Sequence, residues 1–197
     1  MKAFFLISCF VTTACSSVKT LTLSKDVFKS VPFSSQYSAD GALIRNVDYP
    51  SVHALVSQLN SLYQINLQDR NEAHITVVTP PEFQASIAKF VSASEMLARY
   101  SPSIQSVPFD VVCVGSRKSS TAPNLVFFLV VKAPGLNAIR NDLAQEAASR
   151  ARTRSVPFEF QPEAFWAHIT IGFIKGDVFE FTKGPESCLP DVELIVR

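Results

Sequence analysis

Apolar residues recur at helical spacing in three stretches of the chain. The first stretch begins at Ser51, which we expect to cap a helix directly after Pro50. A second helix should open behind Pro80 and Pro81, and a third, rich in alanine, should continue from Leu136. The positions expected to face inward are Val52, Leu55, Val56, Leu59, Leu62 and Tyr63 in the first helix, Phe83, Ile87, Phe90, Val91, Leu97 and Tyr100 in the second, and Leu136, Ile139, Leu143 and Ala147 in the third.

Shorter apolar runs between these stretches predict strands. We expect them at residues 73–79, 109–115, 125–132, 165–174, 178–181 and 192–196. The second and third are joined by a polar turn and should form a hairpin. Helices and strands in this order indicate an α+β protein.

The beginning of the chain follows neither pattern. Lys2 precedes an apolar run from Ala3 to Val11, and small residues follow up to Ala14, which is the layout of a secretory signal peptide. The run is too short to span a bilayer, so we expect no transmembrane segment. Residues 1–16 should therefore be a cleaved signal, and the mature protein should be secreted or exported.

Two of the four cysteines lie in the N-terminal segment and two lie in the rest of the chain. Cys9 would leave with the signal. Cys15 ends a sequence like a bacterial lipoprotein box, although Thr12 stands where leucine is expected, so a lipid anchor at Cys15 is the alternative to simple cleavage. Cys113 and Cys188 remain, and the sequence leaves open whether they form a disulfide or stay as two buried thiols.

Composition and charge limit the structures and partners that we expect for the rest of the chain. Residues 17–40 are rich in serine and should form a lead-in arm with one edge strand near 31–37, while residues 41–197 form the functional domain. With 47% hydrophobic and 18% charged residues, a packed globule is expected rather than disorder. The net charge of +1 argues against extended nucleic acid as a partner, so any nucleotide ligand should be small or bound at one end.

Two matching motifs carry the candidate chemistry, His74-Ile-Thr76-Val77 and His168-Ile-Thr170-Ile171. Residues two apart in a strand point to the same face, so each strand presents one imidazole and one hydroxyl together. One imidazole can take a proton from an attacking water while the other protonates a leaving oxygen, and both titrate near neutral pH. The threonine hydroxyls can donate hydrogen bonds to phosphate oxygens.

The motifs also share their context. Each follows a helix and a polar linker, although the sequences outside the motifs barely match. This repetition predicts a structural duplication, whose two halves would be related by a pseudo-twofold axis and would bring both motif strands to a common cleft.

Other side chains near the motifs have two interpretations each. Trp166 shares the face of the second motif and could stack a nucleobase, or it could belong to the core. Glu72 could orient the ring of His74, or it could be exposed to solvent. Arg117 and Lys118 lie on the expected hairpin turn, where they could reach a phosphate or simply face water.

The paired motifs, with His168 following His74 by 94 residues, resemble the 2H phosphoesterase superfamily. The stretch His74-Ile-Thr-Val-Val-Thr-Pro-Pro-Glu82 is most similar to the Swiss army knife RNA-repair-like and cyclic phosphodiesterase group. The resemblance extends over Gly41 to Arg197 at the level of motifs. It implies a bilobal fold, with two pseudo-twofold-related antiparallel-sheet lobes, helices on the outside and a central cleft.

The resemblance also implies roles for the motif residues. His74 and His168 would be the acid–base pair and Thr76 and Thr170 the phosphate binders, with no metal and no cofactor. The expected activity is hydrolysis of a cyclic phosphate or small phosphodiester derived from a nucleotide or RNA end, with 2',3'-cyclic phosphates as the first guess. A signal peptide would separate this chain from cytosolic RNA-processing members of the superfamily.

Two other functions stay open at this point. The chain could be a non-catalytic module that binds nucleotides or RNA ends in the same pocket. It could also be a zinc enzyme, but only two histidines converge and no familiar ligand spacing supplies the remaining donors. The sequence does not tell which histidine is the acid and which the base.

Overall fold

The computed structural model describes residues 18–34 and 40–197. The signal peptide expected at residues 1–16, the lipid anchor at Cys15 and the end of the lead-in arm lie outside the described residues. In the described part, no helix has both the length and the apolar character that crossing a membrane requires.

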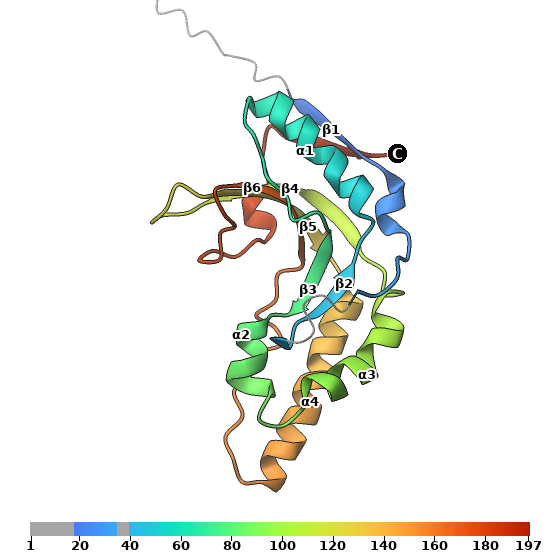
Figure 1. The fold of residues 1–197 in the computed structure, drawn as a ribbon, viewed down its shortest axis with the longest axis vertical. Helices are drawn as coiled ribbons and strands as arrows, with labels where there is room; N and C mark the ends of the chain where they lie inside the picture. Colours follow the sequence, from blue (N-terminus) through green and yellow to red (C-terminus); the bar gives the residue numbers. More distant parts are fainter. Residues whose placement is uncertain (1–17, 35–39) are drawn as a thin grey trace, which may run out of the picture.

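A five-stranded antiparallel sheet forms the centre of the molecule (Figure 1). Its strands, in spatial order, are β2 (Leu43–Asn46), β3 (His74–Val78), β6 (His168–Ile174), β5 (Leu125–Lys132) and β4 (Asp110–Lys118). The two motif strands β3 and β6 are therefore neighbours. Their backbone pairing is a single residue pair, Ile75 with Ile169, although both strands are described in full. The sheet consequently divides into two lobes that are joined at the motifs.

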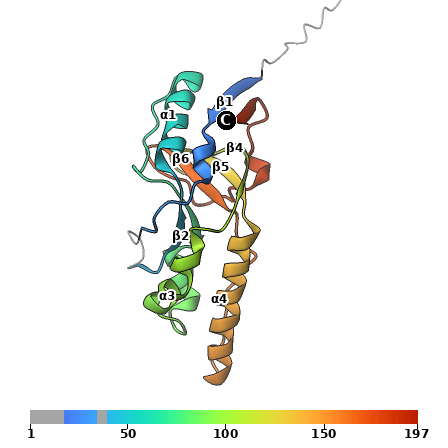
Figure 2. The ribbon, with the colours of Figure 1, turned by 90° about the vertical axis from the view of Figure 1, so that its right-hand side faces the viewer.

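The helices cover the two lobes at opposite ends of the molecule. They are α1 (Tyr49–Tyr63), the short α2 (Pro80–Glu82), α3 (Ala93–Ile104) and α4 (Pro134–Thr153). Figures 1 and 2 place α1 at one end and α3 and α4 at the other. The helix α1 packs against β6, and α4 packs against β3. Each long helix that precedes a motif strand thus contacts the other motif strand, as expected of two duplicated units that exchange helices. The expected α+β class is confirmed.

The first helix begins earlier than the sequence indicated. Asp48, not Ser51, is its N-cap, because the Asp48 side chain accepts a hydrogen bond from the backbone N–H of Ser51. Pro50 then occupies the first turn, where its missing N–H has no helical partner to lose. The prediction that Ser51 caps the helix was wrong for this reason.

The second expected helix is interrupted. The helix α2 continues into a single π-helical turn at Phe83–Ile87, and α3 begins only after a break. Ser92 stops the continuation because its side chain accepts from the N–H of Glu95 while the Glu95 carboxylate accepts from the N–H of Ser92. This capping box is a local signal that could have been recognised in the sequence.

Two strand predictions also need correction. Residues 178–181 form a loop instead of a strand, and residues 31–34 of the expected edge strand are not in a sheet. The strand of the N-terminal segment is β1 (Lys19–Leu23), which pairs in parallel with β7 (Val192–Val196). Its side chains Leu21 and Leu23 are fully buried, so the expected lead-in arm contributes to the hydrophobic core.

Candidate active site

The two motifs lie side by side in the sheet. Because Ile75 pairs with Ile169, the antiparallel register sets His74 opposite Thr170 and Thr76 opposite His168. Both isoleucines are fully buried, which turns the histidines and threonines to the other face. Diagonal neighbours across an antiparallel pair are about 7–8 Å apart, enough for a phosphate to lie between them.

All four motif side chains line one cleft of about 270 Å³. The structure therefore brings His74, Thr76, His168 and Thr170 together, as the duplicated motifs led us to expect. The cleft supplies two imidazoles and two hydroxyls to a volume that suits a phosphate group.

The ring of His74 is held by a carboxylate. Its Nδ1 lies 2.5 Å from Oε2 of Glu72, and the two side chains are 14% and 16% exposed. Of the two interpretations of Glu72, the structure thus favours the one in which it orients the ring.

The ring of His168 is held by a neutral group instead. Its Nδ1 lies 2.8 Å from the carbonyl oxygen of Trp166, which can only accept, so Nδ1 carries the proton. Desolvation by the surrounding protein, and then the charge of Lys183, lower the pKa of His168 to about 4. Near neutral pH the ring is therefore uncharged, and its Nε2 can accept a proton.

Three charged residues in the cleft were missed by the sequence analysis. Lys183 Nζ lies 2.7 Å from Asp177 Oδ1, and both side chains are 5% exposed. Arg70 binds the other carboxylate oxygen of Asp177 at 3.0 Å. Burial lowers the pKa of the Lys183 ammonium, and Asp177 opposes that shift. Two cations against one carboxylate give this group a net positive charge beside the motifs.

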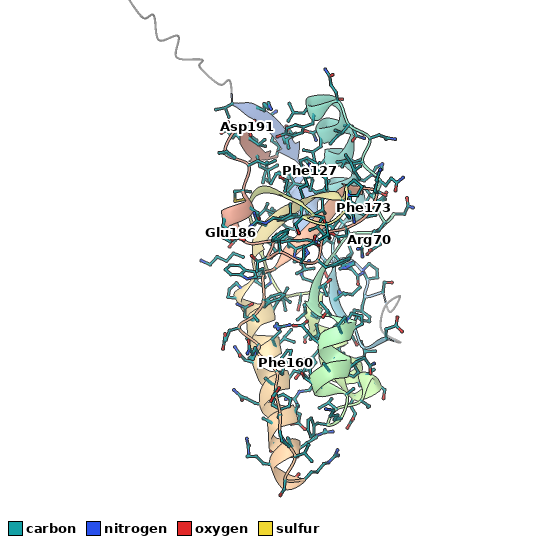
Figure 3. All side chains as sticks on the ribbon, turned by 90° about the vertical axis from the view of Figure 1, so that its left-hand side faces the viewer. Arg70, Phe127, Phe160, Phe173, Glu186 and Asp191 are labelled. Carbon is teal, nitrogen blue, oxygen red and sulfur yellow. A yellow bond between two sulfur atoms is a disulfide. The ribbon has the colours of Figure 1, made fainter. Side chains whose placement is uncertain are left out.

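Arg70 reaches the cleft through a contact between two distant segments. Gln68 and Phe173 of β6 exchange two backbone hydrogen bonds of 2.9 and 2.8 Å. This pairing needs Gly172, since a Cβ there would lie 2.9 Å from the Gln68 carbonyl oxygen. Figure 3 shows Arg70 beside Phe173, whose ring centroid lies 6.0 Å from the guanidinium. No local motif marks this arrangement in the sequence.

The remaining candidates divide between the cleft and the surface. Trp166 is 48% exposed and lines the cleft, just before β6 begins. Arg117 instead donates to the Thr182 carbonyl oxygen and pairs with Glu186, so it does not line the cleft. Lys118 is exposed at the end of β4. Figure 3 places Glu186 and Arg70 on opposite flanks of the sheet.

The described residues offer no ligand set for the zinc alternative. No three side chains of His, Cys, Asp or Glu gather there in a way that could hold a metal ion. Asp177 and Lys183 of the cleft pair with each other, Glu82 pairs with Arg140, and Glu72 contacts His74.

An α+β fold whose two central strands present matching histidine and threonine pairs to one cleft is typical of a phosphoesterase. Comparison with protein families agrees, because the model of the Swiss Army Knife 2H phosphoesterase domain matches residues 42–179. This chain belongs to that family of 2H phosphoesterases. No curated protein and no solved structure gives a significant match to it. The resemblance inferred from the motifs and the 2H fold are thereby confirmed.

Proposed function

We propose that this phosphoesterase hydrolyses cyclic phosphates or small phosphodiesters of nucleotides or RNA ends, with 2',3'-cyclic phosphates as the first substrates to test. The observation that carries the proposal is the difference between the Nδ1 partners of His74 and His168, which line the same cleft. A pair of imidazoles in different environments suits one general base and one general acid.

His168 is the base in this proposal and His74 the acid. Nε2 of His168 takes a proton from water while the water oxygen forms a bond to phosphorus. The bond from phosphorus to the ester oxygen breaks, and His74 protonates the departing oxygen. Glu72 holds the ring of His74 in place through its contact with Nδ1. Proton exchange with solvent then restores both rings.

The other cleft residues stabilise the phosphate. Thr76 and Thr170 can donate hydrogen bonds to its non-bridging oxygens, and Lys183 and Arg70 add positive charge. Because acid, base and charge stabilisation are all supplied by side chains, the proposed reaction requires no metal and no cofactor.

We also propose that the protein works in an exported, oxidising compartment. Cys113 and Cys188 form a disulfide with a Cα–Cα distance of 5.8 Å. Such bonds persist in oxidising compartments and are rare in the cytosol, which supports the location that the N-terminal sequence predicted.

The test is hydrolysis of 2',3'-cyclic nucleotides in the presence of EDTA. His74→Ala and His168→Ala should each lower the rate by about 10² to 10⁴. The double variant should be little worse than the slower single variant, because both residues serve one transition state. His53→Ala is the matched control, since His53 is an exposed histidine of α1 that pairs with Asp69 and does not line the cleft.

Three results would contradict the proposal. A double variant that turns over substrate at the wild-type rate would place the chemistry elsewhere. Activity that EDTA removes and zinc restores would require a metal. A wild-type protein that binds cyclic nucleotides without cleaving them would be the non-catalytic binding module.

A further inference from the structure

Phe179 is displayed to solvent by a loop that is anchored on both sides of it. Its side chain is 79% exposed, although the preceding Val178 is fully buried. Asp177 is held by its ion pairs with Lys183 and Arg70. After Phe179, the carboxylate of Glu180 accepts a hydrogen bond from the Ser119 hydroxyl. The exposure of Phe179 is therefore part of a fixed local structure.

The ring itself is also held in place. Lys183 Nζ lies 5.6 Å from the centroid of the Phe179 ring, within the range of a cation–π contact. Lys183 thus connects the aromatic ring to the charged centre of the cleft. Trp166 and Phe181, which are 48% and 43% exposed, line the same cleft as Phe179. A group of exposed aromatic side chains beside a candidate catalytic centre marks a surface where a ligand can bind.

Phe179 lines two adjoining cavities, which also share Arg70, His74, Thr76 and Thr79. One is the cleft that holds both motifs. The other has a volume of about 560 Å³ and is lined by Ala42, Ile44, Arg70, His74, Thr76, Thr79, Pro80, Pro81 and Phe179. Neither His168 nor Lys183 is among its described lining residues. The second cavity therefore opens on the His74 side of the site.

The location of the second cavity on the His74 side, taken together with the proposed function, indicates which part of the substrate it would hold. If His74 protonates the leaving oxygen, the group attached to that oxygen enters the second cavity. The walls away from the motifs are apolar, contributed by Ala42, Ile44, Pro80 and Pro81, and no acidic side chain lines the cavity among the described residues. Cavities of this size accommodate ligands the size of a nucleoside.

We propose that Phe179, with Ile44 and the prolines Pro80 and Pro81, forms a subsite for the nucleobase of the nucleoside that carries the leaving oxygen. In a 2',3'-cyclic phosphate this nucleoside stays bonded to phosphorus through its second ester oxygen. A planar base can stack on the exposed ring, whereas an aliphatic chain would gain contact area alone. Among the described residues that line this cavity, Thr79 is the one uncharged polar side chain outside the motifs. The subsite should therefore recognise an aromatic face and discriminate weakly among bases.

The test compares a cyclic nucleotide with the same phosphate lacking a base. For adenosine 2',3'-cyclic phosphate, Phe179→Ala should lower kcat/KM by about tenfold or more, the usual cost of losing one stacking contact. For 1-O-methylribose 2',3'-cyclic phosphate the same change should have less than about a twofold effect, because no base is present to stack. Phe179→Trp should retain the preference for the nucleotide, and Phe28→Ala, which removes a 40% exposed phenylalanine outside the cleft, should change neither rate.

Equal losses on both substrates would overturn the subsite, since Phe179 would then act on the loop or the chemistry. It would also be overturned if the wild type used both substrates equally well, or preferred an aliphatic cyclic phosphate. If the wild type cleaves nothing, the proposed function fails, and calorimetry decides the subsite separately. Adenosine 3'-phosphate should then bind more tightly than ribose 3-phosphate in the wild type and not in Phe179→Ala, and equal affinities in the wild type would refute it.

Discussion

The two histidines belong to matching His-Ile-Thr motifs but have different surroundings in the structure. A carboxylate holds Nδ1 of His74, whereas a backbone carbonyl holds Nδ1 of His168. The charge of Lys183 acts on His168 as well. These contacts make the two histidines of the duplicated motifs different from each other. They are the reason why His168 is the proposed base and His74 the proposed acid.

The pH dependence of activity should report this asymmetry. With the pKa of His168 lowered to about 4, the base is active in its neutral form and loses activity only when protonated. The acidic limb of kcat/KM should therefore lie near pH 4, well below the ordinary value of about 6.5 for histidine. Rates measured between about pH 3.5 and 8 will locate the limb.

Desolvation contributes most to the lowered pKa of His168, and Lys183→Met tests the contribution of the nearby charge. Removing the positive charge should raise the pKa of His168, so the acidic limb should move to higher pH and activity at low pH should fall most. Lys183→Arg retains a cation and should keep the limb near its original position. An unchanged limb in Lys183→Met would show that the charge of Lys183 does not act on His168.

At the scale of elements, residues 178–181 were expected to form a strand, but they belong to a loop from Asp177 to Lys183 that forms one wall of the cleft. A small second core holds its beginning, because Val178 packs with Val126, Phe128 and Val130 beside the two disulfide cysteines. The disulfide then ties Cys188, which follows the loop, to strand β4. Side-chain contacts therefore hold this loop in position, because its described residues do not form a ladder of backbone hydrogen bonds with a neighbouring strand.

Removal of the disulfide should weaken both stability and activity. The Cys113→Ser, Cys188→Ser double variant should lose about 2–4 kcal/mol of unfolding free energy in a denaturant titration. Its kcat/KM should also fall, because the segment that carries Lys183 is no longer fastened to β4. Wild type treated with a reductant should behave like the double variant, which should itself be insensitive to the reductant. Full activity of the double variant and of the reduced wild type would show that the remaining contacts hold the loop in position without the disulfide.

At the scale of the whole molecule, the first and last described segments of the chain pair with each other. Strand β1 pairs with β7 near the C-terminus and packs against α1, and Figures 1 and 2 show the two strands at the end of the molecule that holds α1. Lys19 and Asp191 join the same ends by an ion pair of 2.9 Å. The lobe that packs on β6 is therefore completed by a segment that precedes the residues matched by the family model.

A core substitution in β1 should measure this contribution. Leu23 is fully buried, so Leu23→Ala should lower the unfolding free energy by about 2–5 kcal/mol through lost burial and a residual cavity. Val18→Ala, at a position that is 63% exposed, is the control and should have little effect. Equal stabilities of both variants and the wild type would mean that β1 only rests on the surface.

Local patterns in the sequence determined much of this protein. The helical stripes and apolar runs predicted α1, α4 and most of the strands, since their periods of 3.6 and 2 residues are properties of neighbouring positions. The same period of 2 placed His74 with Thr76 and His168 with Thr170 on one face of each strand. The family followed from these motifs, and the family comparison confirmed it.

Only the tertiary structure decided which distant groups meet at those motifs. The pairing of Ile75 with Ile169, the choice between two interpretations of Glu72, and the cluster of Arg70, Asp177 and Lys183 depend on long-range contacts. Charge and burial act through space, so no local pattern around Lys183 shows that it lies near His168. The chain's own periodicity fixed which residues form each strand, whereas packing fixed the electrostatic environment that makes two identical motifs chemically different.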